Sequence, residues 1–207
     1  MTDTAGERAY HHGNLRAELI DQAAAQLRET PAEQLSLRAV ARALGVSQTA
    51  PYRHFSDREA LLAAIATRGY RQLLVALEEA RANAGDSAAE QLRAVGRSYV
   101  EYAAGHEQLF KLMFGPHVQP SEKYPELREA SREALLLVQA ILQHGMGRSE
   151  FAAQDVVYLA NAAWAGIHGV ATLRIDAPAL FKNHIDLTRQ INVSANTFIA
   201  GIEQHPA

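Results

Sequence analysis

The stretch from Ser36 to Phe55, which reads SLRAVARALGVSQTAPYRHF, has the pattern of two short helices joined by a glycine turn. In its first half, Leu37, Val40 and Leu44 fall on one apolar stripe at helical spacing. The serine that opens the stretch is predicted to cap this helix, and Gly45 to end it in a left-handed conformation. This order of elements predicts a helix-turn-helix, whose second helix can enter the major groove of DNA.

The residues predicted for the second helix, which Ser47 is expected to cap, suit contact with DNA. Gln48 stands at its N-terminal end, where side chains reach base edges, and glutamine can pair bidentately with adenine. Tyr52 offers a hydroxyl to phosphate oxygens, which position a helix without reading sequence. The residues predicted from this pattern to contact DNA are Ser36, Arg38, Ser47, Gln48, Thr49, Tyr52, Arg53 and His54. The pattern alone leaves open a helical hairpin in an ordinary all-α domain, whose polar face is merely solvated.

Two segments, HHGNLR at 11–16 and LRAVARALGVSQTAPYRHFSDREALLAAI at 37–65, resemble the DNA-binding domain of the tetracycline-repressor (TetR) family of bacterial transcription regulators. The likeness includes the turn glycine, the Tyr-x-His-Phe end of the second helix, and the basic residue and Glu that open the next helix. It implies that the family's DNA-contact positions are held here by Gln48, Thr49, Tyr52, His54 and Arg58. Pro51 stands where leucine is commoner, and because it restricts the preceding residue, the second helix is expected to start irregularly.

Composition places the chain among ordinary globular proteins of one or two domains, with 207 residues, 48% of them apolar and 21% charged. The chain has no cysteine, which excludes disulfides and thiolate metal sites and fits a reducing cytoplasm. No unbroken apolar run of about 18 residues occurs, so no membrane span is expected. The net charge of −3 falls on the C-terminal part, because residues 1–70 hold equal numbers of basic and acidic residues. This distribution predicts a local basic patch rather than a basic domain.

Helical periodicity continues beyond the first motif, and no alternating strand pattern interrupts it. The predicted fold is all-α, with an N-terminal three-helix helix-turn-helix DNA-binding domain, a C-terminal helical domain, and about nine helices. Besides the two short helices, helices are predicted at 14–30, 58–83, 87–104, 106–114, 122–144, 152–173 and 180–203. The predicted parts are a flexible N-terminal arm at 1–13, the helix-turn-helix domain at 14–57, a linking helix at 58–84 and the C-terminal domain at 85–207, to which the resemblance assigns ligand binding and dimerisation.

The segment YVEYAAGHEQLFKLMF at 99–114 gathers aromatic and other large side chains near helical spacing, interrupted at Gly105. One interpretation is a stripe of the core, because aromatic stripes usually pack. The other is the lining of a small-molecule pocket, which is mostly apolar with a few polar groups. The candidate ligand-binding residues are Tyr99, Tyr102, His106, Phe110 and Met113 in this segment, and Trp164 and His168 further along.

The segment NAAWAGIHGVATL at 161–173 is rich in small residues, and Gly166 and Gly169 belong to repeats that let another helix approach closely. Trp164 and His168 are four residues apart and share a helix face. His168 can be a core histidine with satisfied hydrogen bonds or a polar group of a pocket, and both interpretations are open. The Trp, His and Gly arrangement resembles the C-terminal domain of a TetR subgroup named for those residues. The family resemblance implies a homodimer formed through the last two helices.

These observations predict a cytoplasmic, homodimeric transcription regulator, in the first place a repressor. It would bind a near-palindromic double-stranded DNA operator and be released by a small, largely apolar ligand. No cofactor and no enzymatic activity are expected, since the sequence has no phosphate loop, His-Glu-x-x-His motif or nucleophile elbow. A metal-responsive regulator is an alternative because nine histidines are present. A helical enzyme and a protein-binding adaptor are further alternatives, and an adaptor leaves the polar face from Gln48 to His54 unexplained.

Overall fold

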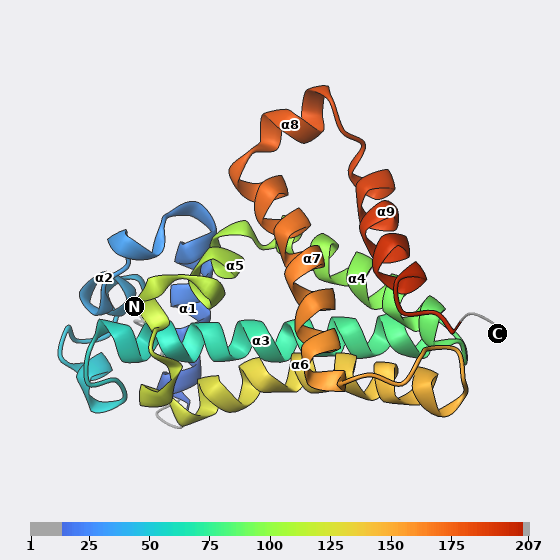
Figure 1. Ribbon diagram of the computed structural model, residues 1–207. Helices are drawn as coiled ribbons and strands as arrows, with labels where there is room; N and C mark the ends of the chain where they lie inside the picture. The colour runs from blue at the N-terminus through green and yellow to red at the C-terminus, as the bar shows by residue number, and fades with distance from the viewer. Residues whose placement is uncertain (1–13, 205–207) are drawn as a thin grey trace, which may run out of the picture.

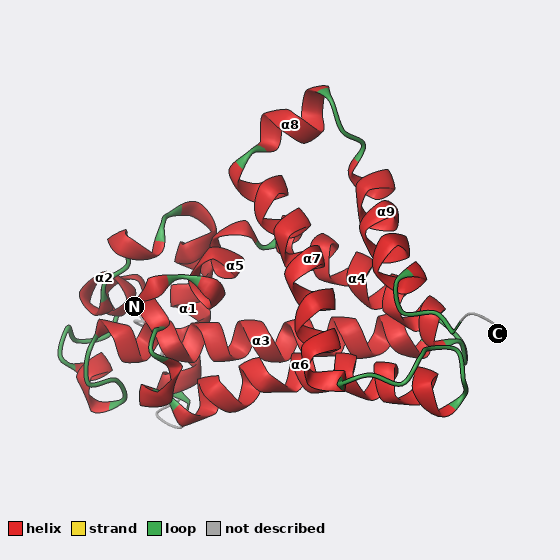
Figure 2. Cartoon of the chain, viewed as in Figure 1, coloured by secondary structure: helices red, strands yellow, loops and turns green. Residues whose placement is uncertain are grey.

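The computed structural model describes residues 14–204, so the predicted arm at 1–13 lies outside the described residues. The described part is all-α, as predicted (Figure 2), and its one extended pairing is an isolated bridge between Phe151 and Glu203. The α-helices in it are α1 (Leu15–Glu29), α2 (Leu37–Ala43), α3 (Arg58–Ala82), α4 (Ala88–Gly105), α5 (Glu107–Phe114), α6 (Pro125–Gly147), α7 (Val156–Asp176), α8 (Pro178–Asn183) and α9 (Leu187–Ala200). Short 3-10 helices lie between them: η1 (Ala32–Gln34), η2 (Ala50–Arg53), η3 (Pro116–Val118) and η4 (Ser121–Lys123).

The N-terminal head consists of α1, η1, α2, η2 and the first turns of α3. Ser36 caps α2 as predicted, since its hydroxyl oxygen accepts a hydrogen bond from the backbone N–H of Ala39 at 3.2 Å. Gly45 follows the helix with a φ of 70°, the left-handed conformation that ends helices. Val40 and Phe55 are buried with side chains of α1 and α3, and they close the small core of the head.

The second element of the helix-turn-helix is the short 3-10 helix η2, where the sequence predicted a longer helix over 48–55. Pro51 explains the difference, because it has no N–H to donate and restricts the conformation of Ala50. The predicted side-chain cap at Ser47 is also wrong. Its backbone carbonyl, and not its hydroxyl, accepts from the N–H of Ala50, at 3.0 Å.

The helix α3 runs from the head into the body (Figure 1) and matches the helix predicted at 58–83. At 1.5 Å per residue it is about 38 Å long. Asp57 caps its start and accepts a hydrogen bond from the N–H of Ala60 at 2.7 Å. In the body α3 packs against α4, α5 and α6, while α7 and α9 pack on α4 and on each other. The short helix α8 joins the far ends of α7 and α9 (Figure 1). One rigid helix therefore connects the head with the body.

Three details of the predicted helices need correction. Asn14 is predicted from its position to cap the first helix, but its side chain makes no cap hydrogen bond to α1. The helix predicted at 122–144 begins at Pro125, which fits a first helical turn, and it continues to Gly147 because glycine also tolerates helical angles. The helix predicted at 180–203 is two helices, α8 and α9. Asp186 separates them, since its carboxylate accepts from the N–H of Arg189 at 2.7 Å and starts a new helix.

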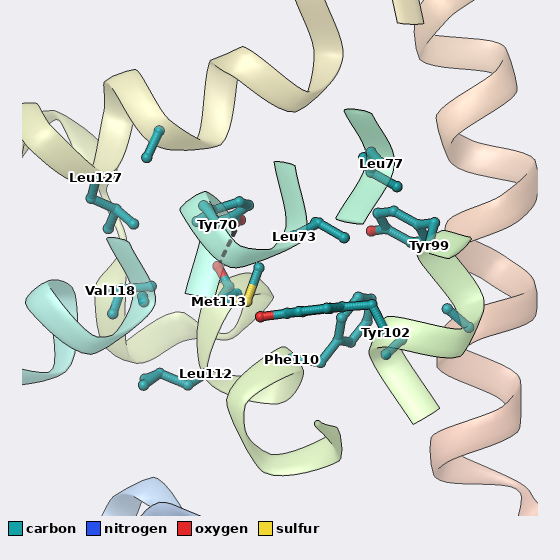
Figure 3. Close-up of a cluster of buried hydrophobic side chains, with 14 of the residues drawn as sticks. Tyr70, Leu73, Leu77, Tyr99, Tyr102, Phe110, Leu112, Met113, Val118 and Leu127 are labelled. Carbon is teal, nitrogen blue, oxygen red and sulfur yellow. Dashed lines mark hydrogen bonds between the residues drawn. The ribbon is translucent and has the colours of Figure 1, made fainter. Parts of the chain in front are cut away.

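The core of the body takes in much of the aromatic segment 99–114. Figure 3 shows Tyr102, Phe110 and Met113 among buried side chains around α3. The Tyr102 hydroxyl donates to the carbonyl of Gly69 at 2.9 Å, and the Tyr70 hydroxyl donates to the carbonyl of Met113 at 3.0 Å. Burial raises the pKa of Tyr102 to about 12, so its phenol stays a neutral donor. These hydrogen bonds tie α4 and α5 to the middle of α3.

Candidate functional site

The head presents an exposed polar surface on α2 and on the segment that contains η2. All eight residues that the helix-turn-helix pattern marked for DNA contact are exposed: Ser36, Arg38, Ser47, Gln48, Thr49, Tyr52, Arg53 and His54. The side chain of Tyr52 is 49% exposed although it is aromatic. Beneath this surface, Pro51 and Phe55 are buried and hold the segment against the core of the head. The polar groups are thus free to meet phosphate and base edges on a firm support.

Arg58, the ninth predicted DNA-contact residue, is held inside the head. Its Nε donates to the carbonyl of Leu35 at 2.9 Å, and one terminal nitrogen donates to the carbonyl of Ala32 at 2.5 Å. Its other terminal nitrogen pairs with Glu59 at 2.9 Å. The guanidinium therefore fixes the start of α3 to the η1 turn, and a phosphate contact by Arg58 stays a prediction.

The body contains a cavity of about 340 Å³ between α3, α4, α6, α7 and α9. The helix α3 contributes Tyr70, Leu73 and Leu77 to its wall, and α9 contributes Phe198 and Ile199. No Asp, Glu, Lys, Arg or His side chain is among the described residues that line it. A mostly apolar cavity of this size, placed between helices, is typical of a small-molecule site.

A chain of hydrogen bonds joins three aromatic side chains at the wall of the cavity. The indole Nε1 of Trp164 donates to the hydroxyl oxygen of Tyr99 at 3.2 Å, and that hydroxyl lies 2.8 Å from Nδ1 of His168. Burial lowers the pKa of His168, which favours the neutral imidazole, so Nδ1 can accept the Tyr99 hydrogen. Phe114 packs against the Trp164 and His168 rings with centroid distances of 6.2 and 4.6 Å. The cluster fixes α7 against α4 and α5.

The helix α7 leaves a long apolar surface uncovered. Tyr158 is 76% exposed, and Val157 and Leu173 are exposed as well. By length and composition alone, α3 and α7 are apolar enough to span a membrane. This criterion averages hydropathy along a helix, so a helix can meet it without an unbroken run of apolar residues. The apolar window of α3 is 56% buried, as in the core helix of a folded domain, whereas that of α7 is only 17% buried. Packing in the core of this subunit therefore does not explain why α7 is so apolar.

Comparison with known proteins decides the class of this chain. Residues 19–65 match the family described as bacterial regulatory proteins, tetR family, and residues 92–191 match the tetracyclin repressor-like C-terminal domain. The chain belongs to the TetR family. It is accordingly a DNA-binding transcriptional regulator, and the polar surface of α2 and η2 lies in the part that matches the family's DNA-binding domain.

Curated relatives of this TetR-family regulator include HTH-type transcriptional regulators of Mycobacterium bovis and Mycobacterium tuberculosis. Each is 30% identical over 119 residues, which are 57% of this chain and 51% of the relative. The regulator thus spans about half the length of the curated relatives that it matches.

Solved structures similar to this regulator cover nearly the whole chain. A protein of unknown function from Rhodococcus sp. RHA1 is 33% identical, with a TM-score of 0.85 over 96% of this chain and 100% of that one. FadR from Bacillus subtilis, solved in complex with stearoyl-CoA, is 20% identical, with a TM-score of 0.73 over 91% of this chain and 100% of that one. The TetR-family regulator PfmR from Thermus thermophilus is 22% identical, with a TM-score of 0.66 over 90% of this chain and 99% of that one. At these identities FadR and PfmR support the fold alone.

The structure of the regulator separates the predicted ligand-binding residues into three groups. Tyr99 and Trp164 line the cavity, and His168 lies behind them, hydrogen-bonded to Tyr99. His106 is exposed and stacks on the ring of Tyr102, with centroids 4.4 Å apart. The remaining residues of the set are in the core and outside the lining: Tyr102, Phe110 and Met113. These three residues are surrounded by core side chains, as in the interpretation of the aromatic segment as a stripe of the core.

Sequence reasoning missed most of the cavity wall of the regulator. Ser131, Leu135 and Val138 come from α6, and Ser194 and Phe198 from α9, neither of which was marked as a site. The apolar ones among them are signalled only by the apolar stripe of each helix, which is the same for a core residue and a lining residue, and the two serines have no sequence signal. Among residues 14–204, no three His, Cys, Asp or Glu side chains gather where they could hold a metal ion.

Proposed function

We propose that this regulator is a homodimeric repressor, which binds a near-palindromic operator and is released when a small, largely apolar ligand occupies the cavity in the body. Its place of action is then the cytoplasm, where chromosomal DNA is accessible. The observation that carries the proposal is the position of the cavity. Tyr70, Leu73 and Leu77 belong to its wall and also to α3, the helix that begins in the head.

The uncovered face of α7 supports a dimer. A second copy packed on α7 and α9 would bury exposed apolar side chains such as Tyr158 and Val193. A Cβ built on Gly166 or Gly169 has no atom within 4 Å in the subunit. Gly166 is part of the cavity lining, so Gly169 is the glycine that leaves room for a partner helix outside the cavity. A twofold dimer docks two recognition segments on half-sites about one helical turn of DNA apart, or a multiple of it.

The wall of the cavity supports control of the head by a ligand. A ligand between α3, α4 and α7 favours whichever setting of these helices it binds more tightly. From Tyr70, the first cavity residue of α3, to Arg58 at its start is about 18 Å along the helix axis. Since both recognition segments of a dimer must fit one groove spacing together, a small change in the angle of α3 lowers the affinity for the operator.

FadR from Bacillus subtilis, which has a similar fold, was solved with stearoyl-CoA, so this fold is compatible with a small-molecule ligand. The acyl-CoA is a property of that protein. For this regulator, it is one class of ligand to be tested against others.

A selection of genomic DNA fragments on the purified protein, followed by gel shifts on the enriched sequence, tests the proposal. The expected result is one near-palindromic sequence, bound by two subunits as counted by sedimentation of the complex. Binding without sequence preference, or by a single subunit, would contradict the proposal.

A further inference from the structure

We infer that the cavity selects uncharged ligands, which combine an apolar body with one neutral hydrogen-bonding group such as an amide, an alcohol or a ketone. Carboxylates and ammonium ions are selected against. This inference rests on the proposed role of the cavity as a ligand site, and it names the chemical class of that ligand.

The hydroxyl groups at the deep part of the wall have their partners within the protein. The Tyr70 hydroxyl donates to the carbonyl of Met113 at 3.0 Å. The Tyr99 hydroxyl accepts from Trp164 and pairs with Nδ1 of His168. Around them the wall is mostly hydrocarbon. Its two serine hydroxyls also have partners, since that of Ser131 donates to the carbonyl of Arg128 and that of Ser194 accepts from Gln190. A polar ligand group placed there would lose its water without gaining a partner, so the buried part of the ligand must be apolar.

Two neutral amides stand at the exposed edge of the lining, on Asn161 and Gln119. Asn161 donates one amide hydrogen to the carbonyl of Val157 at 3.0 Å, which leaves its oxygen as an acceptor. Within residues 14–204, the Gln119 side chain has no hydrogen bond. An amide side chain both donates and accepts, so it matches a neutral ligand group such as an amide or a hydroxyl. Neither side chain carries a charge that could balance an ion.

Formal charges lie away from the wall. His168 touches the lining through its hydrogen bond with Tyr99, and burial lowers the pKa of its imidazole. Arg128 and Arg132 of α6 are exposed, so water and salt screen them. The chain as a whole carries a net charge of −3, which does not attract anions. An ion moved from water to this wall therefore loses hydration without a compensating partner.

The size of the cavity also favours a small ligand with an apolar body. About 340 Å³ is at the small end of the range for ligand sites, and it suits a ring system or a short alkyl chain. The phosphates of a coenzyme A thioester call for basic side chains, and none is in the lining among the described residues. The selectivity inferred here therefore differs from that of the acyl-CoA-bound relative.

Trp164 is the only tryptophan of the chain and lies on the wall, so its fluorescence reports occupancy directly. The probes are octanamide, octanoate and octylammonium, which are unbranched and have eight carbons each, at a pH of about 7.5, where the latter two are ionised. Octanamide is expected to bind roughly tenfold more tightly than either ion, or better still. A smaller preference would overturn the inference while leaving a ligand site in place. Failure of all three probes to bind would overturn both the inference and the ligand-controlled function.

Two variants and one matched control locate the effect. Ala134→Phe fills the cavity from α6 and should abolish octanamide binding, whereas Ala82→Phe, on an exposed position outside the lining, should leave it intact. Gln119→Lys places a cation at the edge and should tighten octanoate by several-fold relative to octylammonium. If Ala134→Phe still binds octanamide, or Gln119→Lys leaves the ratio of the octanoate and octylammonium Kd values unchanged, the inference is wrong.

Discussion

The imidazole Nε2 of His117 lies 2.6 Å from Oε1 of Glu33, and this pair joins the loop between α5 and α6 to the η1 turn of the head. The hydrogen bond from His117 lowers the pKa of Glu33, so the carboxylate is favoured there. Phe114 at the end of α5 and Gln119 within this loop lie on either side of His117 in the chain, and both line the cavity. The wall of the cavity thus reaches the head by a second route, besides α3.

His117→Ala is expected to reduce the effect of a cavity ligand on operator binding, while changing stability little. Glu33 is exposed and His117 is half-buried, and ion pairs near the surface contribute little to stability. The proposed role of the pair is to keep the loop in a fixed position relative to the head. The measurement is the operator Kd with and without saturating octanamide, for His117→Ala, Glu33→Gln and the double variant. The ratio of the two Kd values should shrink in each single variant and no further in the double. A ratio equal to that of the unchanged protein in all three would remove the loop from the coupling.

Gln48→Ala is expected to cost about 1–3 kcal/mol on the cognate operator and to relax the base preference at one position of each half-site. The matched control is Tyr52→Phe, which removes a predicted phosphate contact and should weaken binding to all sequences alike. Gel shifts on the operator and on singly substituted operators measure both. Unchanged specificity in Gln48→Ala would mean that η2 does not read bases through this residue. Arg58→Ala is not a suitable control, because it also breaks hydrogen bonds within the head.

Gly169→Leu and Gly166→Leu are expected to give monomers in sedimentation experiments, because a leucine side chain prevents close approach of a partner helix. Within one subunit both positions have open space, so the fold itself should tolerate the change. Gly147→Leu is the control, since Gly147 also faces open space but ends α6. Dimers that persist in both α7 variants would place the subunit interface elsewhere.

The stability of the body is expected to fall as the pH drops below about 6.5, the ordinary pKa of histidine. Burial lowers the pKa of His168, so the unfolded chain binds the proton first and is favoured in acid. This contribution is fully present above the unfolded pKa and is lost as the pH falls through the folded one. Chemical denaturation at a series of pH values should show a shallower loss for His168→Gln. Identical pH dependence in both proteins would show that burial of His168 does not make the stability of the body depend on pH.

Local signals in the sequence predicted most of the fold. The cap at Ser36, the glycine turn at Gly45 and the long apolar stripe of α3 each depend on neighbours within a few residues, and all are found. The two helices that differ from the prediction have local causes too. Pro51 prevents an α-helix in η2, and Asp186 starts a new helix in the middle of a continuous apolar pattern.

The cavity could be predicted only in part, because it depends on how distant helices pack. Tyr99 and Trp164 were marked as candidates for their residue type, and both line it. Tyr102 was marked on the same grounds, but the carbonyl of Gly69 satisfies its hydroxyl inside the core. No spacing within α4 distinguishes Tyr99 from Tyr102. That distinction comes from α7, which brings His168 to Tyr99 from another part of the chain.

Reciprocal coupling between the cavity and the operator is the most direct test of ligand control. The operator Kd is measured by gel shift at zero and at saturating octanamide, and the octanamide Kd by Trp164 fluorescence at zero and at saturating operator. Both Kd values should rise by the same factor, of about 5–150, which corresponds to about 1–3 kcal/mol of coupling. An operator affinity that is unchanged when the cavity is saturated would contradict control of this regulator by its cavity ligand.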